Sequence, residues 1–199
     1  MSNYTESIEK LIDRLIKLPG IGRRSAERIV AYILSASGQE VKSLSEAISN
    51  VKENVRFCSI CNSLSEEELC KICQDIRRKK DIICIVEKPS DVTAIEKAGG
   101  FSGVYHVLLG SISPLEGMGP SDLKIDGLMN RIKNDNVKEV IIATGFETEG
   151  ETTALYLTKL LKPQGIKLSR IGVGIPMGSN VEYADSTTLS KALESRREI

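Results

Sequence analysis

The chain has 199 residues, with 27 basic and 27 acidic side chains that leave a formal net charge of zero at neutral pH. This balance excludes binding to nucleic acid through overall charge, so any contact with DNA must come from a local patch and must weaken as salt is added. The low aromatic content and the absence of tryptophan argue against an extended platform for stacking bases.

Hydropathy places the chain outside the membrane. No run approaches the roughly 18 apolar residues that a membrane-spanning helix needs. The start of the sequence, Ser2–Glu6, is polar and has no apolar signal segment. We therefore expect a cytoplasmic protein that makes no membrane contact.

The first 56 residues are predicted to form three helices. Apolar residues recur at helical spacing in the segments Thr5–Lys17, Arg23–Ser35 and Ser43–Val55. The first two segments are separated by Leu18-Pro19-Gly20-Ile21-Gly22, in which a proline and two glycines force a tight turn. Helices of this length bury little apolar surface by themselves, so we expect them to rely on a partner chain or on the rest of the protein.

The turn between the first two helices is a candidate phosphate contact. Gly20 and Gly22 leave backbone N–H groups uncovered at a helix N-terminus, where free donors and the helix dipole attract an anion. Arg23, Arg24 and Arg28 lie beside this turn and could add charge contacts, none of which would read bases. The string resembles the helix-hairpin-helix motif of DNA-binding proteins, which we favour over an ordinary hairpin with a solvated basic face.

Four cysteines follow as two close pairs, Cys58 with Cys61 and Cys70 with Cys73. Two Cys-x-x-Cys turns that face each other bring four thiolates to one point, as tetrahedral Zn²⁺ requires. Two disulfides of a secreted domain are the alternative, which the polar N-terminus disfavours. The loop between the pairs is too short for a helix that reads a DNA groove, so we expect a structural zinc that makes a rigid joint and keeps residues 57–76 folded.

The rest of the chain alternates between strands and helices. Apolar runs predict buried strands at residues 82–86, 104–109, 140–143 and 168–171. Helical patterns lie between and after them, at residues 90–98, 127–134 and 150–161. Such alternation predicts a parallel sheet that is covered on both faces.

Five smaller features complete this part of the prediction. The tail from Ser186 to Arg197 is predicted to be a short helix. The basic run Arg77–Lys80 is predicted to be a solvated connection, with a supplementary phosphate contact as the alternative, and the loop Ser111–Asp122 is predicted to be mobile. Cys84 lies in an apolar run and is expected to be a small buried hydrophobe. His106, the single histidine, is expected to be packed or hydrogen-bonded rather than catalytic.

Three carboxylates are expected at one end of this sheet. Glu87 ends the first strand, and Glu149 and Glu151 follow the third. Functional groups of an open parallel sheet gather beyond the carboxyl ends of adjacent strands. The three side chains could hold Mg²⁺, which takes oxygen ligands, or they could form an acidic rim that docks a basic partner. Their spacing alone does not choose between these two roles.

The acidic pattern carries a resemblance. A glutamate that closes a buried strand, followed by an acidic-x-acidic pair after a later strand, resembles the Toprim domain of topoisomerases, primases and certain nucleases. With the hairpin and the four cysteines before it, the chain resembles the RecR family of bacterial recombination mediators over essentially its full length. Further matching stretches are Tyr105–Leu108, Ile112–Leu115, Glu149–Leu157, Gly174–Gly178 and Glu182–Asp185.

The resemblance implies both a fold and a role. It implies an α/β protein with a helix-hairpin-helix region at 1–56, a zinc finger and connector at 57–80, a Toprim domain at 81–176 and a C-terminal segment at 177–199. It also implies a homotetrameric ring that encircles single- or double-stranded DNA in the bacterial nucleoid. Such rings act with RecO and RecF to help load RecA onto single strands, and they catalyse no reaction. One structural zinc per chain would be the cofactor, and the three carboxylates would serve mainly to dock a partner.

The chain departs from the family pattern at three places. Gly145-Phe146 stands where many relatives have Asn-Pro, and Ser179-Asn180 follows Gly178 where a glycine and an acid are common. Glu149-x-Glu151 replaces the Asp-x-Asp of catalytic Toprim enzymes, and the longer carboxylates reach a metal in a different geometry, which disfavours Mg²⁺. The alternative function is a Mg²⁺-dependent Toprim nuclease or phosphoryl-transfer enzyme, in which the three glutamates would hold the metal.

Overall fold

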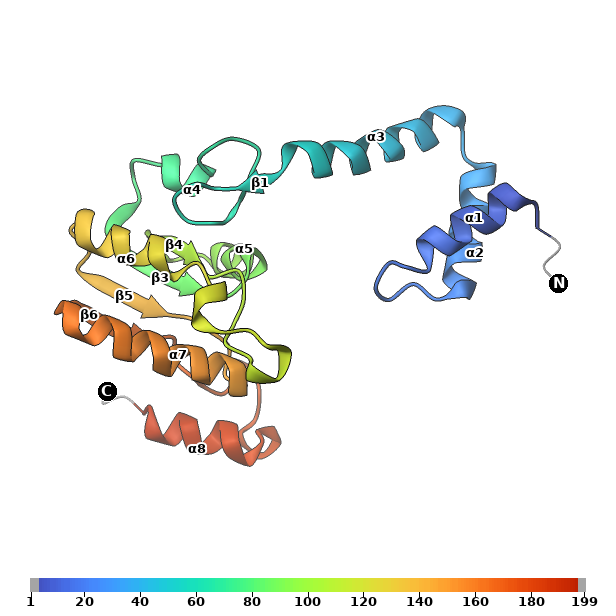
Figure 1. Cartoon of the computed structure of the whole chain (residues 1–199). Helices are drawn as coiled ribbons and strands as arrows, with labels where there is room; N and C mark the ends of the chain where they lie inside the picture. Colours follow the sequence, from blue (N-terminus) through green and yellow to red (C-terminus); the bar gives the residue numbers. More distant parts are fainter. Residues whose placement is uncertain (1–3, 197–199) are drawn as a thin grey trace. The chain divides into compact units, whose positions relative to one another are not determined.

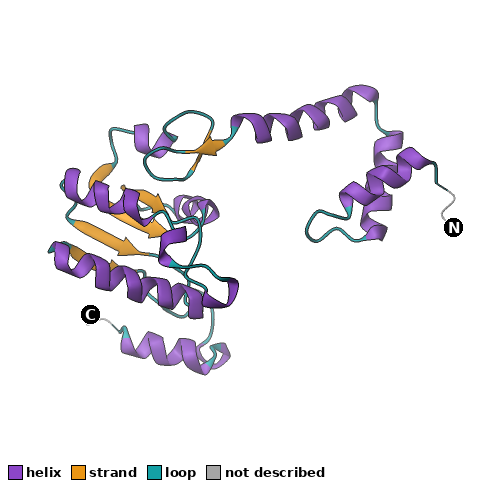
Figure 2. Cartoon of the chain, in the orientation of Figure 1, coloured by secondary structure: helices purple, strands orange, loops and turns teal. Residues whose placement is uncertain are grey.

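The computed structural model describes residues 4–196, and the chain divides into two compact units, one ending at Val55 and the other beginning at Arg56 (Figure 1). Within the described residues, every strand lies in the second unit (Figure 2). No helix in residues 4–196 has the length and apolar character needed to cross a membrane.

The first unit consists of the helices α1 (Glu6–Leu15), α2 (Arg23–Ser35) and α3 (Gly38–Asn54). The first two predicted helices are confirmed. They pack on each other through a small core that contains the buried side chains of Ile12, Ala26 and Val30.

The third helix begins earlier than its apolar spacing predicts. Ser37 Oγ accepts a hydrogen bond from the Glu40 N–H, and the Glu40 carboxylate accepts one from the Ser37 N–H. This capping box satisfies two donors of the first turn and fixes the start of α3 at Gly38. The predicted start at Ser43 is wrong because the cap, rather than the first apolar residue, sets where the helix begins. No residue of α3 is buried, which agrees with the expectation that these helices do not make a sufficient core by themselves.

The second unit is built on a four-stranded parallel sheet with the strand order β4-β3-β5-β6. The strands are β3 (Lys79–Val86), β4 (Gly103–Val107), β5 (Glu139–Ile142) and β6 (Lys167–Arg170). All four predicted strands are confirmed, although β3 begins three residues before the apolar run at 82–86.

Residues of β3 alternate between two apolar cores. The helices that pack on the sheet are α5 (Pro89–Ala98), α6 (Ile125–Asn134) and α7 (Thr148–Leu161). Ile83 and Ile85 belong to the core formed with α6 and α7, whereas Cys84 and Val86 belong to the core formed with α5. Because successive side chains of a strand point to opposite faces, α5 covers one face and the other two helices cover the other. The prediction of a sheet covered on both faces is confirmed.

A small module of residues 56–75, here called the cysteine module, precedes the sheet. It contains a short antiparallel pair, β1 (Arg56–Phe57) and β2 (Leu64–Ser65), and one turn of helix, α4 (Lys71–Gln74). After the sheet, α8 (Ser186–Glu194) confirms the predicted helix of the tail. Arg197, where that helix was predicted to end, lies outside the described residues.

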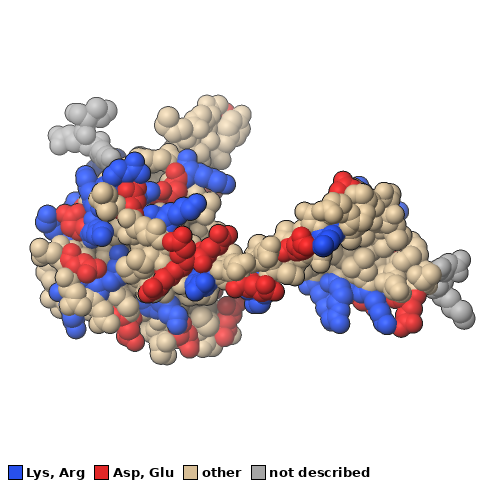
Figure 3. Space-filling view, turned by 90° about the horizontal axis from the view of Figure 1, so that it is seen from above, with Lys and Arg blue, Asp and Glu red and all other residues tan. Residues whose placement is uncertain are grey.

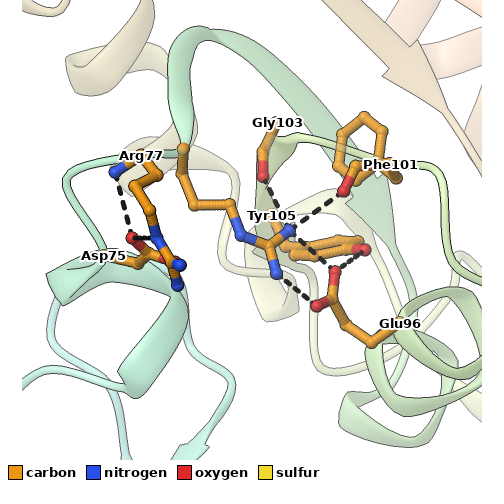
Figure 4. A network of polar contacts seen from close by, with 7 residues as sticks. Asp75, Arg77, Glu96, Phe101, Gly103 and Tyr105 are labelled. Atoms are coloured by element: carbon orange, nitrogen blue, oxygen red, sulfur yellow. Dashed lines mark hydrogen bonds and ion pairs between the residues drawn. The ribbon is translucent and has the colours of Figure 1, made fainter.

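The prediction of a solvated basic connection at Arg77–Lys80 is wrong for Arg78. Its guanidinium pairs with the carboxylate of Glu96 in α5, and its Nη1 donates to the carbonyl oxygens of Phe101 and Gly103 at 3.1 and 3.3 Å (Figure 4). Only 17% of this side chain is exposed. The prediction was wrong because four consecutive basic residues cannot be distinguished in the sequence, and only the fold shows that Arg78 points inward.

The two single-residue predictions inside the sheet are confirmed. Cys84 is buried, and its burial raises the pKa of the thiol to about 12. His106 is fully buried, and its Nε2 lies 2.6 Å from the carbonyl oxygen of Lys124, while Nη1 of Arg131 lies 3.5 Å from its Nδ1. Burial lowers the pKa of His106 to about 4, so a neutral imidazole ties β4 to the residue that precedes α6.

His106 is expected to make the protein sensitive to acid. A pKa that folding lowers from 6.5 to about 4 gives stability that is complete above pH 6.5 and is lost as the pH falls through 4. Within this window the loss is about 1.4 kcal/mol per pH unit. In His106→Gln an amide N–H replaces the donor to Lys124 but cannot titrate. Urea unfolding between pH 7 and pH 4.5 should therefore show a shallower fall in unfolding free energy for the variant, and parallel curves would contradict this role.

Candidate metal centre and interaction surfaces

The four paired cysteines converge on one point. Their sulfur atoms all lie within 4.8 Å of one another, all four side chains are buried, and none is in a disulfide. The sulfur atoms of Cys61 and Cys70 are 3.5 Å apart, close to the separation of about 3.8 Å in a tetrahedron with Zn–S bonds of about 2.3 Å. Hydrogen bonds among these close thiols lower the pKa of Cys70 and raise the pKa values of Cys61 and Cys73, so the thiols titrate as a group. These donors fit Zn²⁺.

Backbone hydrogen bonds shape the two cysteine turns. The Asn62 N–H donates to the Cys58 carbonyl at 3.0 Å, and the Gln74 N–H donates to the Cys70 carbonyl at 3.1 Å. Asn62 has a φ of 60°, a left-handed conformation that asparagine adopts more readily than most residues. Each turn therefore presents its two sulfur atoms to the same side.

The cysteine module is fixed to the edge strand β4. The Val107 N–H donates to the Cys61 carbonyl at 2.8 Å, and the Val107 carbonyl accepts from Nδ2 of Asn62 at 3.2 Å. Ile72 packs against both the cysteine cluster and the core on the α5 face. The module is thus attached rigidly to the sheet. The predicted rigid joint requires such an attachment between the zinc module and the sheet.

Side chains cover the carbonyl oxygens along β4. Alternate residues of the strand, namely Gly103, Tyr105 and Val107, each have a carbonyl that accepts from a side chain outside the sheet. The donors are, in the same order, Arg78, Arg131 and Asn62. The basic segment 77–80, the helix α6 and the cysteine module therefore each contribute one donor that covers a carbonyl on this edge of the sheet.

The hairpin turn between α1 and α2 has the geometry of an open helix start. Gly20 has a φ of +79°, in the left-handed region that favours glycine. Gly22 is the N-cap of α2, and no side chain caps the helix there. The first N–H groups of α2 are therefore available to an external acceptor, as the predicted phosphate contact requires.

The structure divides the three predicted arginines into two kinds. Arg23 pairs with Glu9 at 3.1 Å and with Glu27 at 3.2 Å, which joins α2 to α1. Arg24 and Arg28 are exposed, lie one helical turn apart and have no ionic partner within residues 4–196. These two side chains are free to bind an anion, whereas Arg23 would first have to leave the carboxylates of Glu9 and Glu27.

Sequence reasoning missed one cation at this turn. Lys17 is exposed directly before the turn residue Leu18 and has no ionic partner in the described part of the chain. Figure 3 shows Lys and Arg side chains gathered on one side of the first unit. The sequence could have predicted this cation, because a lysine between the end of one helix and the Pro-Gly turn can lie beside the start of the next helix.

The predicted carboxylates occupy the carboxyl edge of the sheet, meaning the residues just after β3 and β5 and the first turn of α7. Glu87 is 8% exposed, and its carboxylate accepts from the Gly145 N–H at 3.0 Å. Burial, together with the charges of Glu147 and Asp91, raises the pKa of Glu87. Gly150 allows the close approach of α7, because a Cβ there would collide with the backbone of Gly145.

The other two carboxylates differ from each other. Glu151 pairs with Arg170 at 2.5 Å and with Lys191 of α8 at 3.2 Å, and these contacts lower its pKa. The Phe146 ring lies 4.7 Å from the Arg170 guanidinium and 5.6 Å from the Lys191 ammonium, so this departure from the family pattern helps to fasten α8. Glu149 has no side-chain partner among the described residues.

The carboxyl edge is thus not a preformed cluster of metal ligands. Within residues 4–196, the four cysteines are the one group of three or more candidate ligands whose atoms all lie within 4.8 Å of one another. Glu87 is engaged by a backbone donor and Glu151 by two cations. Of the three carboxylates, only that of Glu149 has no partner within these residues.

Comparison with known families accounts for nearly the whole chain. The matches are the RecR helix-hairpin-helix at residues 8–52, the RecR four-cysteine zinc finger domain at 55–75, the Toprim domain at 81–172 and the RecR C-terminal region at 174–197. Two proteins named Recombination protein RecR, from Syntrophotalea carbinolica and Pelotomaculum thermopropionicum, are each 49% identical over 199 residues. Both alignments cover the whole of each chain.

The fold and the cysteine centre define a Toprim protein that also carries a helix-hairpin-helix region and a zinc finger. Cys58, Cys61, Cys70 and Cys73 hold one structural zinc ion. The chain belongs to the RecR family of recombination proteins. The predicted fold class, family and zinc cofactor are therefore confirmed.

Proposed function

We propose that this chain is a recombination mediator that binds DNA without reading its sequence and catalyses no reaction. The observation that carries the proposal is the pair Arg24 and Arg28, exposed and unpaired within the described residues, beside the open start of α2. Backbone N–H groups and arginines of this kind contact phosphates, which position a protein on DNA but carry no sequence information. Binding through Gly20, Gly22 and these arginines would therefore tolerate any sequence.

We also propose a homotetrameric ring that acts with RecO and RecF to help load RecA onto single-stranded DNA. Family membership supports this role, since the full-length relatives are named recombination proteins. The carboxylate of Glu149, which has no side-chain partner among the described residues, suits a partner surface that carries lysine or arginine, and we propose that RecO supplies it. Glu151 would contribute only if a partner competed with Arg170 and Lys191 for it.

The rival function, a Mg²⁺-dependent nuclease or phosphoryl-transfer enzyme, receives less support from the carboxyl edge. A metal at this edge would have to compete with Arg170 and Lys191 for Glu151 and would share the Glu87 carboxylate with the Gly145 N–H. Mg²⁺ needs near-ideal octahedral geometry from hard oxygen ligands, so such competition weakens its binding. We therefore assign the carboxyl edge to docking.

The combined variant Arg24→Ala/Arg28→Ala is expected to bind DNA at least about tenfold more weakly at low salt. Each arginine that leaves a phosphate should lower the slope of log affinity against log salt by about 0.9 for duplex DNA, so the slope should fall by about two. Fluorescence anisotropy with duplexes of unrelated sequence, over a series of salt concentrations, measures both quantities.

Arg23→Ala is the matched control, because Arg23 lies on the same turn of α2 but pairs with Glu9 and Glu27. Its loss should change the salt slope less than the combined variant does. Unchanged affinity of the Arg24→Ala/Arg28→Ala protein at low salt would count against the proposed DNA contact.

A further inference from the structure

One apolar side chain projects from the loop between β4 and α6. Leu115 is 97% exposed and lies in a short 3-10 turn, η1 (Pro114–Glu116). Figure 1 shows this loop beside the beginning of α7. A leucine with nearly its whole side chain in water loses favourable burial, of the order of 2 kcal/mol, that a partner could restore.

The loop that presents Leu115 is tied together rather than open. Ser113 and Met118 exchange backbone hydrogen bonds at 3.0 and 2.9 Å, which closes the loop behind its tip. Ser113 is buried, Met118 packs against the sheet core, and Gly117 turns the chain with a φ of +72°. The loop that was predicted to be mobile is therefore closed by backbone hydrogen bonds behind its tip, because glycines and prolines also build tight turns.

The same loop is bound to the carboxyl edge. The Gly110 N–H donates to the carbonyl of Glu87 at 3.1 Å, and the Ile112 N–H donates to Oγ1 of Thr153 at 2.8 Å. Thr153 Oγ1 in turn donates to the carbonyl of Glu149 at 2.7 Å. These contacts join the base of the Leu115 loop to both of the carboxylate-bearing segments that were assigned to docking.

The surroundings of Leu115 are acidic. The segments 87–91, 110–124 and 144–151 together contain seven acidic and two basic residues, and two further cations, Arg170 and Lys191, pair with one of these acids, Glu151. The acidic residues are Glu87, Asp91, Glu116, Asp122, Glu147, Glu149 and Glu151, and the basic residues are Lys88 and Lys124. Such a surface repels the phosphates of DNA and attracts a protein surface rich in lysine and arginine.

We propose that Leu115 is the apolar anchor of this docking surface and enters an apolar pocket that is rimmed by lysine and arginine on a partner protein. The inference rests on the proposed function, which assigns the carboxyl edge to docking. Stable interfaces place a few apolar residues at the centre and polar residues around them, as Leu115 and its acidic neighbours are placed. The hydrogen-bonded loop also holds the anchor in position before binding, which reduces the entropic cost of association.

Leu115→Ala is expected to weaken binding of RecO at least about tenfold in titration calorimetry, without changing the thermal midpoint of the free protein. Ile76→Ala is the matched control, because Ile76 is 91% exposed but lies before the amino end of β3, away from the carboxyl edge. This control should bind RecO as the unaltered protein does. Gly117→Ala keeps Leu115 but strains the positive φ of the turn, so it should weaken binding to a smaller extent.

A third variant, Glu149→Lys, separates failure of the anchor from failure of the docking surface. If Glu149→Lys weakens RecO binding and Leu115→Ala does not, the anchor is wrong and the acidic docking surface stands. If the unaltered protein does not bind RecO, the partner assignment fails and this inference fails with it. If Leu115→Ala weakens DNA binding in the anisotropy assay instead, the loop is a DNA contact and the proposal is overturned.

Discussion

Replacement of Cys58 by alanine is expected to abolish zinc binding and to unfold residues 56–75 while the parallel sheet stays folded. The reason is that this module has little apolar core apart from its four cysteines and the neighbouring Leu69 and Ile72. Sites of this kind contribute apparent binding free energies of roughly 10–16 kcal/mol, which is also the folding free energy of the module around them. No other replacement considered for this chain should have a larger local effect.

Amide hydrogen exchange at Val107 reports this loss directly. Its N–H donates to the Cys61 carbonyl, so unfolding of the cysteine module should expose that amide and accelerate its exchange, while amides at the centre of β3 stay protected. Cys84→Ala is the matched control, because Cys84 is buried in the sheet and should leave one zinc per chain. A Cys58→Ala protein without zinc but with normal exchange at Val107 would contradict the structural role of the metal.

Replacement of Arg78 by alanine is expected to lower the unfolding free energy by about 2 to 3 kcal/mol. The change removes the cation that Glu96 faces and leaves the carbonyls of Phe101 and Gly103 without this donor (Figure 4). Glu96 would keep the Tyr105 hydroxyl, which donates to it at 2.6 Å. Urea denaturation at neutral pH measures the difference.

The neighbouring Arg77 provides a control for the charge alone. Its side chain is 86% exposed and pairs with Asp75 two residues away, so Arg77→Ala should leave the unfolding free energy almost unchanged. Arg78 is also the main reason why the pKa of Glu96 is lowered, so the stability from this pair is present above pH 4.5 and is lost as the pH falls below it. Equal effects of the two replacements would mean that the contacts of Arg78 do not stabilise the fold.

Patterns that repeat along the chain were sufficient to predict the sheet. The runs at 82–86 and 140–143 are apolar because strands of a parallel sheet are buried on both faces. Such burial produces a continuous apolar run in any sequence. The zinc site was equally predictable, since few kinds of site other than zinc centres use two Cys-x-x-Cys turns at this spacing. Both features depend on residue type and interval, which a sequence records completely.

Features that depend on a single distant contact were not predictable. Glu149 and Glu151 are two residues apart and look equivalent, yet only the second meets Arg170 and Lys191, which follow it by 19 and 40 residues. Phe146 is a departure from the family pattern, and its role likewise depends on two distant cations, Arg170 and Lys191, that lie beside its ring. Tertiary packing determines side-chain partners of this kind, and the spacing of residues along the chain does not reveal that packing.

The covered carbonyls of β4 have a consequence for how the sheet can grow. An edge strand with free backbone groups is a template on which another chain can add a strand, in ordered assembly or in aggregation. Arg78, Arg131 and the zinc-stabilised turn at Asn62 occupy the outward carbonyl oxygens of Gly103, Tyr105 and Val107 in β4. Loss of zinc would therefore free the N–H and the carbonyl of Val107, which would allow another strand to pair with this edge.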